Sequence, residues 1–245
     1  MTNTELKNEF LIHYNAIASN SAPGLDDYEI SVFLTKAQLE LVKNYYNPLG
    51  NKYKDGFEHS EKRRVDLKEL IVNHISTTEI NDPHKLVADS QFYTIPSDVF
   101  VLILEQAKVS TNDCLNGKYI DVYPKTHDEF LIQYANPFKK PDADHIWRID
   151  YSKIGANSVV ELVSPYNIVE YKARYIKYPS PIILVDLDVA FPSEGLSIDG
   201  ITAATTCKLN QEIHREIIDR AVELALRDYK PSNLESKIQL DQRNE

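Results

Sequence analysis

Three residues in the second half of the sequence have types and spacing that could bind a metal ion. Asp142, Asp144 and His145 form an acid–x–acid–His run within DADHIW. Carboxylate oxygens and imidazole nitrogens are ligands for hard or borderline cations. The run follows NPFKKP in an expected surface turn, and a metal site needs ligands that converge from several directions. We therefore interpret it as a solvated loop, with a metal- or acid-dependent hydrolase as the alternative.

A second acid pair, Asp186 and Asp188 in VDLD, would place both side chains on one face of an extended segment. Such pairs can hold a metal with a nucleotide, but no glycine-rich loop or lysine follows to hold the phosphates. We interpret the pair as an exposed strand face or turn.

The run His127–Asp128–Glu129 resembles a general-base cluster, yet acids at the start of a short helix are expected to cap its end and offset its dipole.

The common motifs of catalytic and phosphate-binding sites are absent from the sequence. There is no GxSxG, GxxxxGK[ST], GxGxxG or HExxH, and the chain has only 7 glycines. Cys114 and Cys207 have no CxxC partner, so we expect two separate thiols in a protein that folds in the cytoplasm. The basic run EKRR, residues 61–64, is expected on a solvated helix face, with a contact to DNA or an acidic neighbour as the alternative. We predict no catalytic residue, no cofactor and no bound metal.

The composition indicates a globular and acidic protein. Hydrophobic residues make up 42% and charged residues 26% of 245 residues, and the formal net charge is −10. Proteins that grip nucleic acid concentrate lysine and arginine instead. An acidic wall could still surround DNA, because it repels phosphate and lets the duplex slide. No apolar run approaches the ~20 residues that span a bilayer, and the N-terminus does not resemble a secretory signal, so no membrane partner is expected.

Helical periodicity occurs near both ends of the chain. The first helix begins with a Thr2–Glu5 capping box, and the second begins at Asp26–Asp27 and ends at Asn47–Pro48. A third helix is predicted from about Ser60 through residue 76. The last helix lies within residues 209–229, with Asn210 as its cap, and has an apolar face too wide for one neighbour to cover.

The middle of the chain is rich in β-branched and aromatic residues, which favour strands. Residues 99–110, VFVLILEQAKVS, are ambiguous, but their composition favours a strand. A short helix with a Thr126–Glu129 capping box is predicted between two strands. The order of elements predicts an α+β fold, in which N-terminal helices and the C-terminal helix form a bundle with an inserted, mostly antiparallel β lobe. The expected divisions are residues 1–83, 84–206, 207–230 and a polar tail, 231–245, that a neighbour could order.

Several stretches resemble, in the same order, blocks of crAss-like bacteriophage head–tail connector or tail ring proteins. The wider class includes the tail tubular protein A type of adaptor in short-tailed phages. The resemblance spans roughly residues 15–229, and its strength lies in the series of blocks rather than in one strict signature. The blocks are SNSAPGLDDYEISVFLTKAQLELV, FYTIPSDVFVLILEQA, YIDVYPKTHDEFLIQYANPFKKP, VELVSPYNIVEYKARYIKYPSPIIL and LNQEIHREIIDRAVELAL.

This resemblance implies a non-enzymatic structural subunit of the virion. Such proteins form rings, usually dodecameric, below the portal and around the DNA exit channel, so the implied partners are identical subunits, the portal protein, adjacent tail rings and passing duplex DNA. A closed ring needs two different, complementary faces on one subunit, which long amphipathic helices could supply. Two alternatives stay open: the hydrolase built on Asp142, Asp144 and His145 or on Asp186 and Asp188, and a β-rich binding module of the tail with an exposed aromatic platform.

Overall fold

The computed structural model divides the chain into two compact units. One unit contains residues 1–70 and 179–245, and the other contains Ile71–Tyr178. The sequence pattern predicts divisions at 83/84 and 206/207. The polar tail lies outside the described residues, which are 1–18, 24–46, 60–81, 84–112, 114–142, 144–154 and 157–229.

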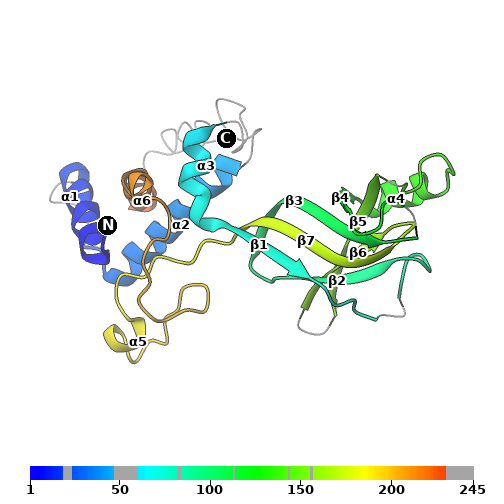
Figure 1. Cartoon of the computed structure of the whole chain (residues 1–245). Coiled ribbons are helices and arrows are strands. Elements are labelled where there is room, and N and C mark those ends of the chain that lie inside the picture. Colours follow the sequence, from blue (N-terminus) through cyan, green and yellow to red (C-terminus); the bar gives the residue numbers. More distant parts are fainter. Residues whose placement is uncertain are drawn as a thin grey trace. The chain divides into compact units, whose positions relative to one another are not determined.

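Helices from both ends of the chain form the first unit. Its elements are α1 (Asn3–Ala18), α2 (Asp27–Tyr46), α3 (Glu61–Leu67), η3 (Lys68–Leu70), α5 (Leu187–Ala190), η4 (Gln211–Ile213) and α6 (His214–Tyr229). Helix α6 contacts both α1 and α2, as the sequence predicted (Figure 1). None of the helices in the described ranges has both the length and the apolar character required to span a membrane.

The apolar face of α6 is covered within the chain. Ile217, Ile218, Ala221, Val222 and Ala225 are all at most 2% exposed. Because α1 and α2 pack on different sides of α6, two helices can cover a stripe that one could not. The Arg220 Nε atom also lies 2.7 Å from Glu40 Oε2 on α2. The wide apolar face that the sequence predicted for this helix is therefore covered by two neighbouring helices of the same chain.

Side-chain caps fix the starts of the first two helices. The Thr2 amide donates to Glu5 Oε2 at 2.8 Å, and the Glu5 amide donates to Thr2 Oγ1 at 3.3 Å. Asp26 and Glu29 form the same reciprocal pair at 3.0 and 2.8 Å. The prediction for Asn210 was wrong in its chemistry, since this residue stands at the N-cap of η4 but makes no side-chain cap bond.

The predicted third helix is shorter than expected. Helix α3 ends at Leu67, and after η3 the chain forms strand β1 (Ile71–Ser76). Strand β1 pairs with β7 along its whole length, from Ile71 opposite Ile176 to Ser76 opposite Tyr171. The β-branched residues Ile71, Val72 and Ile75 are compatible with a strand. The local sequence pattern does not distinguish a helix from a strand here, and pairing with β7 favours the strand.

Residues 179–206 have little regular structure but belong to the helical unit. Polar side chains of α2 supply hydrogen bonds to this segment. Gln38 Nε2 donates to the Ser180 carbonyl at 2.9 Å, and the Leu184 amide donates to Ser31 Oγ at 3.1 Å. Backbone groups that have no sheet or helix partner are thereby satisfied, which explains why polar residues are buried on α2.

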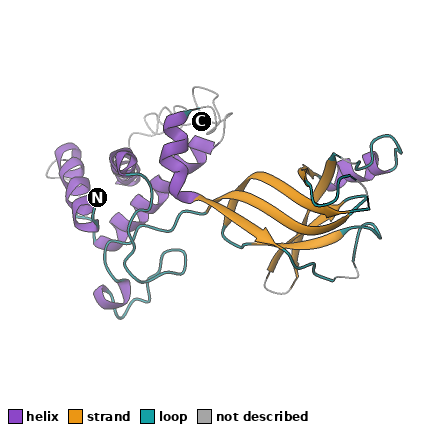
Figure 2. Ribbon diagram, viewed as in Figure 1, coloured by secondary structure: helices purple, strands orange, loops and turns teal. Residues whose placement is uncertain are grey.

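The second unit is a seven-stranded sheet in the order β1-β7-β3-β4-β5-β6-β2 (Figures 1 and 2). Only β4 and β5 pair in parallel, and helix α4 (His127–Tyr134) lies between them in sequence. The predicted α+β class with a mostly antiparallel sheet is thus confirmed, as is the strand at residues 99–110. The strands not yet delimited are β2 (Gln91–Ile95), β3 (Val99–Ser110), β4 (Tyr119–Lys125), β5 (His145–Ile154), β6 (Asn157–Val163) and β7 (Asn167–Lys177).

The two edge strands of this sheet meet, so that it nearly closes into a barrel. His74 Nε2 lies 3.1 Å from the Thr94 carbonyl oxygen, and the Ser76 and Thr94 hydroxyls lie 3.0 Å apart. Side-chain contacts therefore join β1 to β2 where a backbone ladder would complete the barrel. The interior is mostly apolar, and its buried apolar cluster includes Tyr93, Ala107, Val109, Ile120, Val122, Ile146, Val160, Leu162, Ile168, Tyr171 and Ala173.

Candidate functional site

The candidate metal site at residues 142–145 is a surface turn. Asp142 Oδ1 lies 2.7 Å from His145 Nδ1 and accepts a hydrogen bond from the Asp144 amide at 3.0 Å. The hydrogen bond with His145 is the main cause of a lowered pKa for Asp142. The structure therefore brings Asp142 and His145 together, but Asp144 contributes its backbone rather than its carboxylate. This geometry orders the entry to β5.

The second acid pair caps a helix. The Asp186 carboxylate accepts hydrogen bonds from the amides of Asp188 and Val189 at 3.1 and 3.3 Å, which places it at the N-cap of α5. Asp188 accepts from the Thr202 hydroxyl at 2.7 Å. The pair is therefore part of a turn and short helix, not a strand face. Across the residues that the structure describes, no three histidine, cysteine, aspartate or glutamate side chains gather closely enough to hold a metal ion.

Two of the remaining chemical candidates have structural partners. Thr126 Oγ1 accepts from the Glu129 amide at 3.3 Å, so the run at 127–129 begins α4 as predicted. In the basic run 61–64, Lys62 Nζ lies 2.8 Å from Glu216 Oε1, and this contact raises the pKa of Lys62. Cys114 is exposed and Cys207 is half-buried, and both are free thiols. Burial raises the pKa of the Cys207 thiol to about 11.

A buried charged cluster inside the sheet was missed by the sequence reasoning. Arg148 Nη1 lies 3.4 Å from Glu105 Oε1, and the Tyr171 hydroxyl donates to Glu105 Oε2 at 2.7 Å. Asp150 Oδ1 lies 3.6 Å from the same Arg148 nitrogen. Glu105 precedes the buried residues Ala107 and Val109 with a period of two, and this alternation was the available signal that its side chain points inward.

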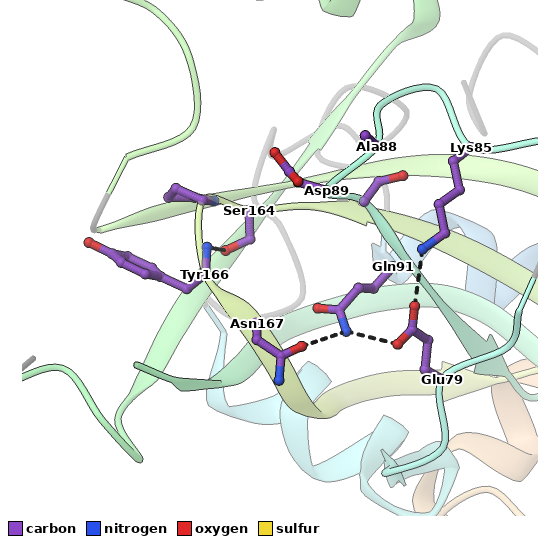
Figure 3. Close-up of a pocket in the computed structure, with 10 residues that line it drawn as sticks. Glu79, Lys85, Ala88, Asp89, Gln91, Ser164, Tyr166 and Asn167 are labelled. Atoms are coloured by element: carbon purple, nitrogen blue, oxygen red, sulfur yellow. Dashed lines mark hydrogen bonds and ion pairs between the residues drawn. The ribbon is translucent and has the colours of Figure 1, made fainter. Parts of the chain in front are cut away.

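A polar cavity of about 310 Å³ lies beside β2 and the turn between β6 and β7 (Figure 3). The side-chain amide of Gln91 donates to Glu79 Oε2 and to Asn167 Oδ1, both at 3.1 Å, and Lys85 lies 3.2 Å from Glu79. The side-chain oxygen Oε1 of Gln91 accepts a hydrogen bond from the Ile168 amide at 2.6 Å. These groups pair with one another and connect the loop before β2 to the sheet. The Ser90 hydroxyl, which also lines the cavity, donates to Oε1 of the buried Glu161 side chain.

Exposed apolar side chains are the surface feature that remains. The largest exposed fractions belong to Phe138 at 97%, Val189 at 79%, Ile132 at 76%, Leu131 at 67% and Ile12 at 65%. Three of these lie on α4 or in the turn that follows it. Apolar groups exposed in this way are typical of protein–protein contact surfaces. These exposed apolar side chains are suited to contact with another protein.

Comparison with known proteins agrees with that interpretation. A family model described as phage tail ring protein 3/4 matches residues 1–236. Ring protein 4/5 of Bacteroides phage crAss001 is 39% identical over 249 residues, covering 100% of both chains. Ring protein 3 of the same phage is 36% identical over 228 residues, covering 92% of this chain and 95% of that protein.

Proposed function

Because this chain belongs to the phage tail ring protein 3/4 family, we propose that it is a structural ring subunit at the head–tail junction or upper tail. In this proposal the ring is dodecameric and surrounds the channel through which DNA leaves the head. The subunit assembles in the host cytoplasm and has no catalytic role. The exposed apolar side chains of α4 and its following turn are the observation that carries the proposal, because apolar groups gathered in this way are typical of protein–protein contact surfaces.

The proposed partners are identical subunits, the portal protein and adjacent tail rings. Bacteroides phage crAss001 has two relatives of this chain with different ring names, which supports a neighbouring ring made of a related subunit. Electron microscopy of the chain co-expressed with its portal tests this assignment. Closed rings that stack on the portal are expected, whereas a monomer that leaves the portal bare would contradict it.

We further propose that acidic side chains line the channel. The net charge of −10 supports this, because like charge keeps the phosphate backbone from adhering to the wall. Purified rings should therefore retain no duplex DNA at physiological salt in a filter-binding assay. Retention that weakens steeply with added salt would indicate a basic, phosphate-gripping lumen and would refute the sliding hypothesis.

A further inference from the structure

Helix α4 has one side anchored in its own unit and one side uncovered. The Phe130 ring stacks on Tyr134 with centroids 5.2 Å apart and meets Trp147 edge-on at 6.3 Å. The next two residues, Leu131 and Ile132, are instead exposed. In Figure 1, α4 and the turn after it lie at one end of the sheet. We define the α4 tip as Leu131, Ile132, Phe138, Lys139 and Lys140, all of which are exposed.

The part of the α4 tip that follows the helix is apolar and positively charged, whereas Asp128 and Glu129 lie one turn before Leu131 and Ile132 on α4. Residues 130–140 contain Lys139 and Lys140 but no acid. Lys140 Nζ lies 4.5 Å from the centre of the Tyr134 ring, which keeps its charge beside the apolar residues. The nearby Asp142 carboxylate is engaged by His145. A partner for this surface should therefore offer apolar groups surrounded by acids.

The helical unit has a surface of that kind. We define the α5 loop as residues 186–199, which contain Asp186, Asp188, Glu194 and Asp199 and no lysine or arginine. Val189, on helix α5 near the start of this loop, is 79% exposed. The loop is anchored to the helical unit, because Leu187 is fully buried and packs in a cluster with Ile183 and Ile198. It is therefore a formed apolar and acidic surface.

We propose that the α4 tip of one copy docks on the α5 loop of the next copy, as the repeating contact of the ring. The inference rests on the proposed ring function and deepens it by naming the contact. A ring needs a heterologous interface with two different surfaces, and these two have complementary charge. The exposed Ile12 on α1 fits the α4 tip less well, because the cation Lys7 lies on the same helix and because Asp219 already makes a hydrogen bond with His13.

Cysteine cross-linking of the full chain tests this contact. The exposed Cys114 is first replaced in a Cys114→Ser background. One preparation then carries Phe138→Cys and the other carries Val189→Cys, and the two are mixed with a short bismaleimide. The covalent heterodimer should form roughly tenfold faster or more than in the matched control mixture of Phe138→Cys with Ile12→Cys, because docking raises the local thiol concentration.

Charge reversal adds a second measurement. Lys139→Glu with Lys140→Glu should slow the 138–189 reaction several-fold, and Glu194→Lys in the partner chain should recover part of the rate. Equal rates for the 138–189 and 138–12 mixtures would overturn the proposed contact, as would a predominance of 138–138 products. Rings seen by electron microscopy without the 138–189 product would overturn the contact alone. A fast 138–189 product without rings on the portal would count against the ring function instead.

Discussion

Replacing Arg148 by methionine should strongly destabilise the strand-rich unit at neutral pH. The arginine side chain is 10% exposed and the Glu105 side chain is 6% exposed, so the change leaves a carboxylate buried without its cation. Breaking a buried ion pair from one side costs about 3–5 kcal/mol. At a urea dependence of about 2 kcal/mol per M, the unfolding midpoint should fall by about 2 M.

The size of this effect should depend on pH with a definite sign. In the wild-type protein burial raises the pKa of Glu105 above 4.5, although Arg148 and the Tyr171 hydroxyl oppose that shift. Without Arg148 the folded-state pKa rises further. An acid whose pKa is raised by folding reduces stability at neutral pH, and that loss disappears as pH falls toward the unfolded-state value. The difference in unfolding free energy between variant and wild type should therefore be largest at pH 7 and shrink toward pH 4.5.

The assay can follow this unit separately because the chain contains 1 tryptophan, Trp147, which is 4% exposed and adjacent to the substituted residue. Urea unfolding monitored by its fluorescence at pH 7 and pH 4.5 gives both quantities. Arg174→Met on β7 is the matched control, since this arginine is exposed and its loss should cost about 0.5 kcal/mol or less. A variant as stable as wild type at pH 7, or a difference that grows as pH falls, would refute the reasoning.

Three further outcomes are expected. Ile217→Ala, at a fully buried position on α6, should lower the free energy of unfolding by about 2–5 kcal/mol, measured by far-ultraviolet circular dichroism in urea. At pH 8 a thiol reagent should label Cys114 rapidly and Cys207 only after unfolding, because the pKa of Cys207 is raised to about 11; equal labelling of both in the native protein would contradict this. Burial lowers the pKa of His214, so the unfolded state binds a proton at a higher pH than the folded state does. The helical unit should therefore lose stability as pH falls below about 6.5. A His214→Gln variant should lack this component of the pH dependence.

Local signals in the sequence were sufficient for several elements. The Thr2–Glu5 and Thr126–Glu129 pairs mark helix starts because a cap depends only on residues three apart. The strand at residues 99–110 was favoured by its β-branched composition and is β3. The family resemblance rested on a series of blocks, and the full-length similarity to the ring proteins confirms it.

Features that depend on distant partners could not be predicted in the same way. Strand β1 was assigned to a helix because its partner β7 lies about a hundred residues later in the chain. The acids at 186 and 188 were interpreted as a strand face or a turn, and the helix that begins there was missed because 4 residues are too few to show periodicity. The pairing of Glu105 with Arg148 likewise requires knowledge of the strand order, which no local window contains.

The near-closure of the sheet has a consequence for a protein that must meet many copies of itself. Open strand edges template indiscriminate pairing between chains and lead to aggregates. Here the edge residues His74 and Ser76 already face Thr94 of the opposite edge, so each edge shields the other. Recognition between copies therefore depends on side chains, which can distinguish one neighbour and one orientation. Hydrogen bonding by unpaired backbone groups of the sheet edges contributes little to this selectivity.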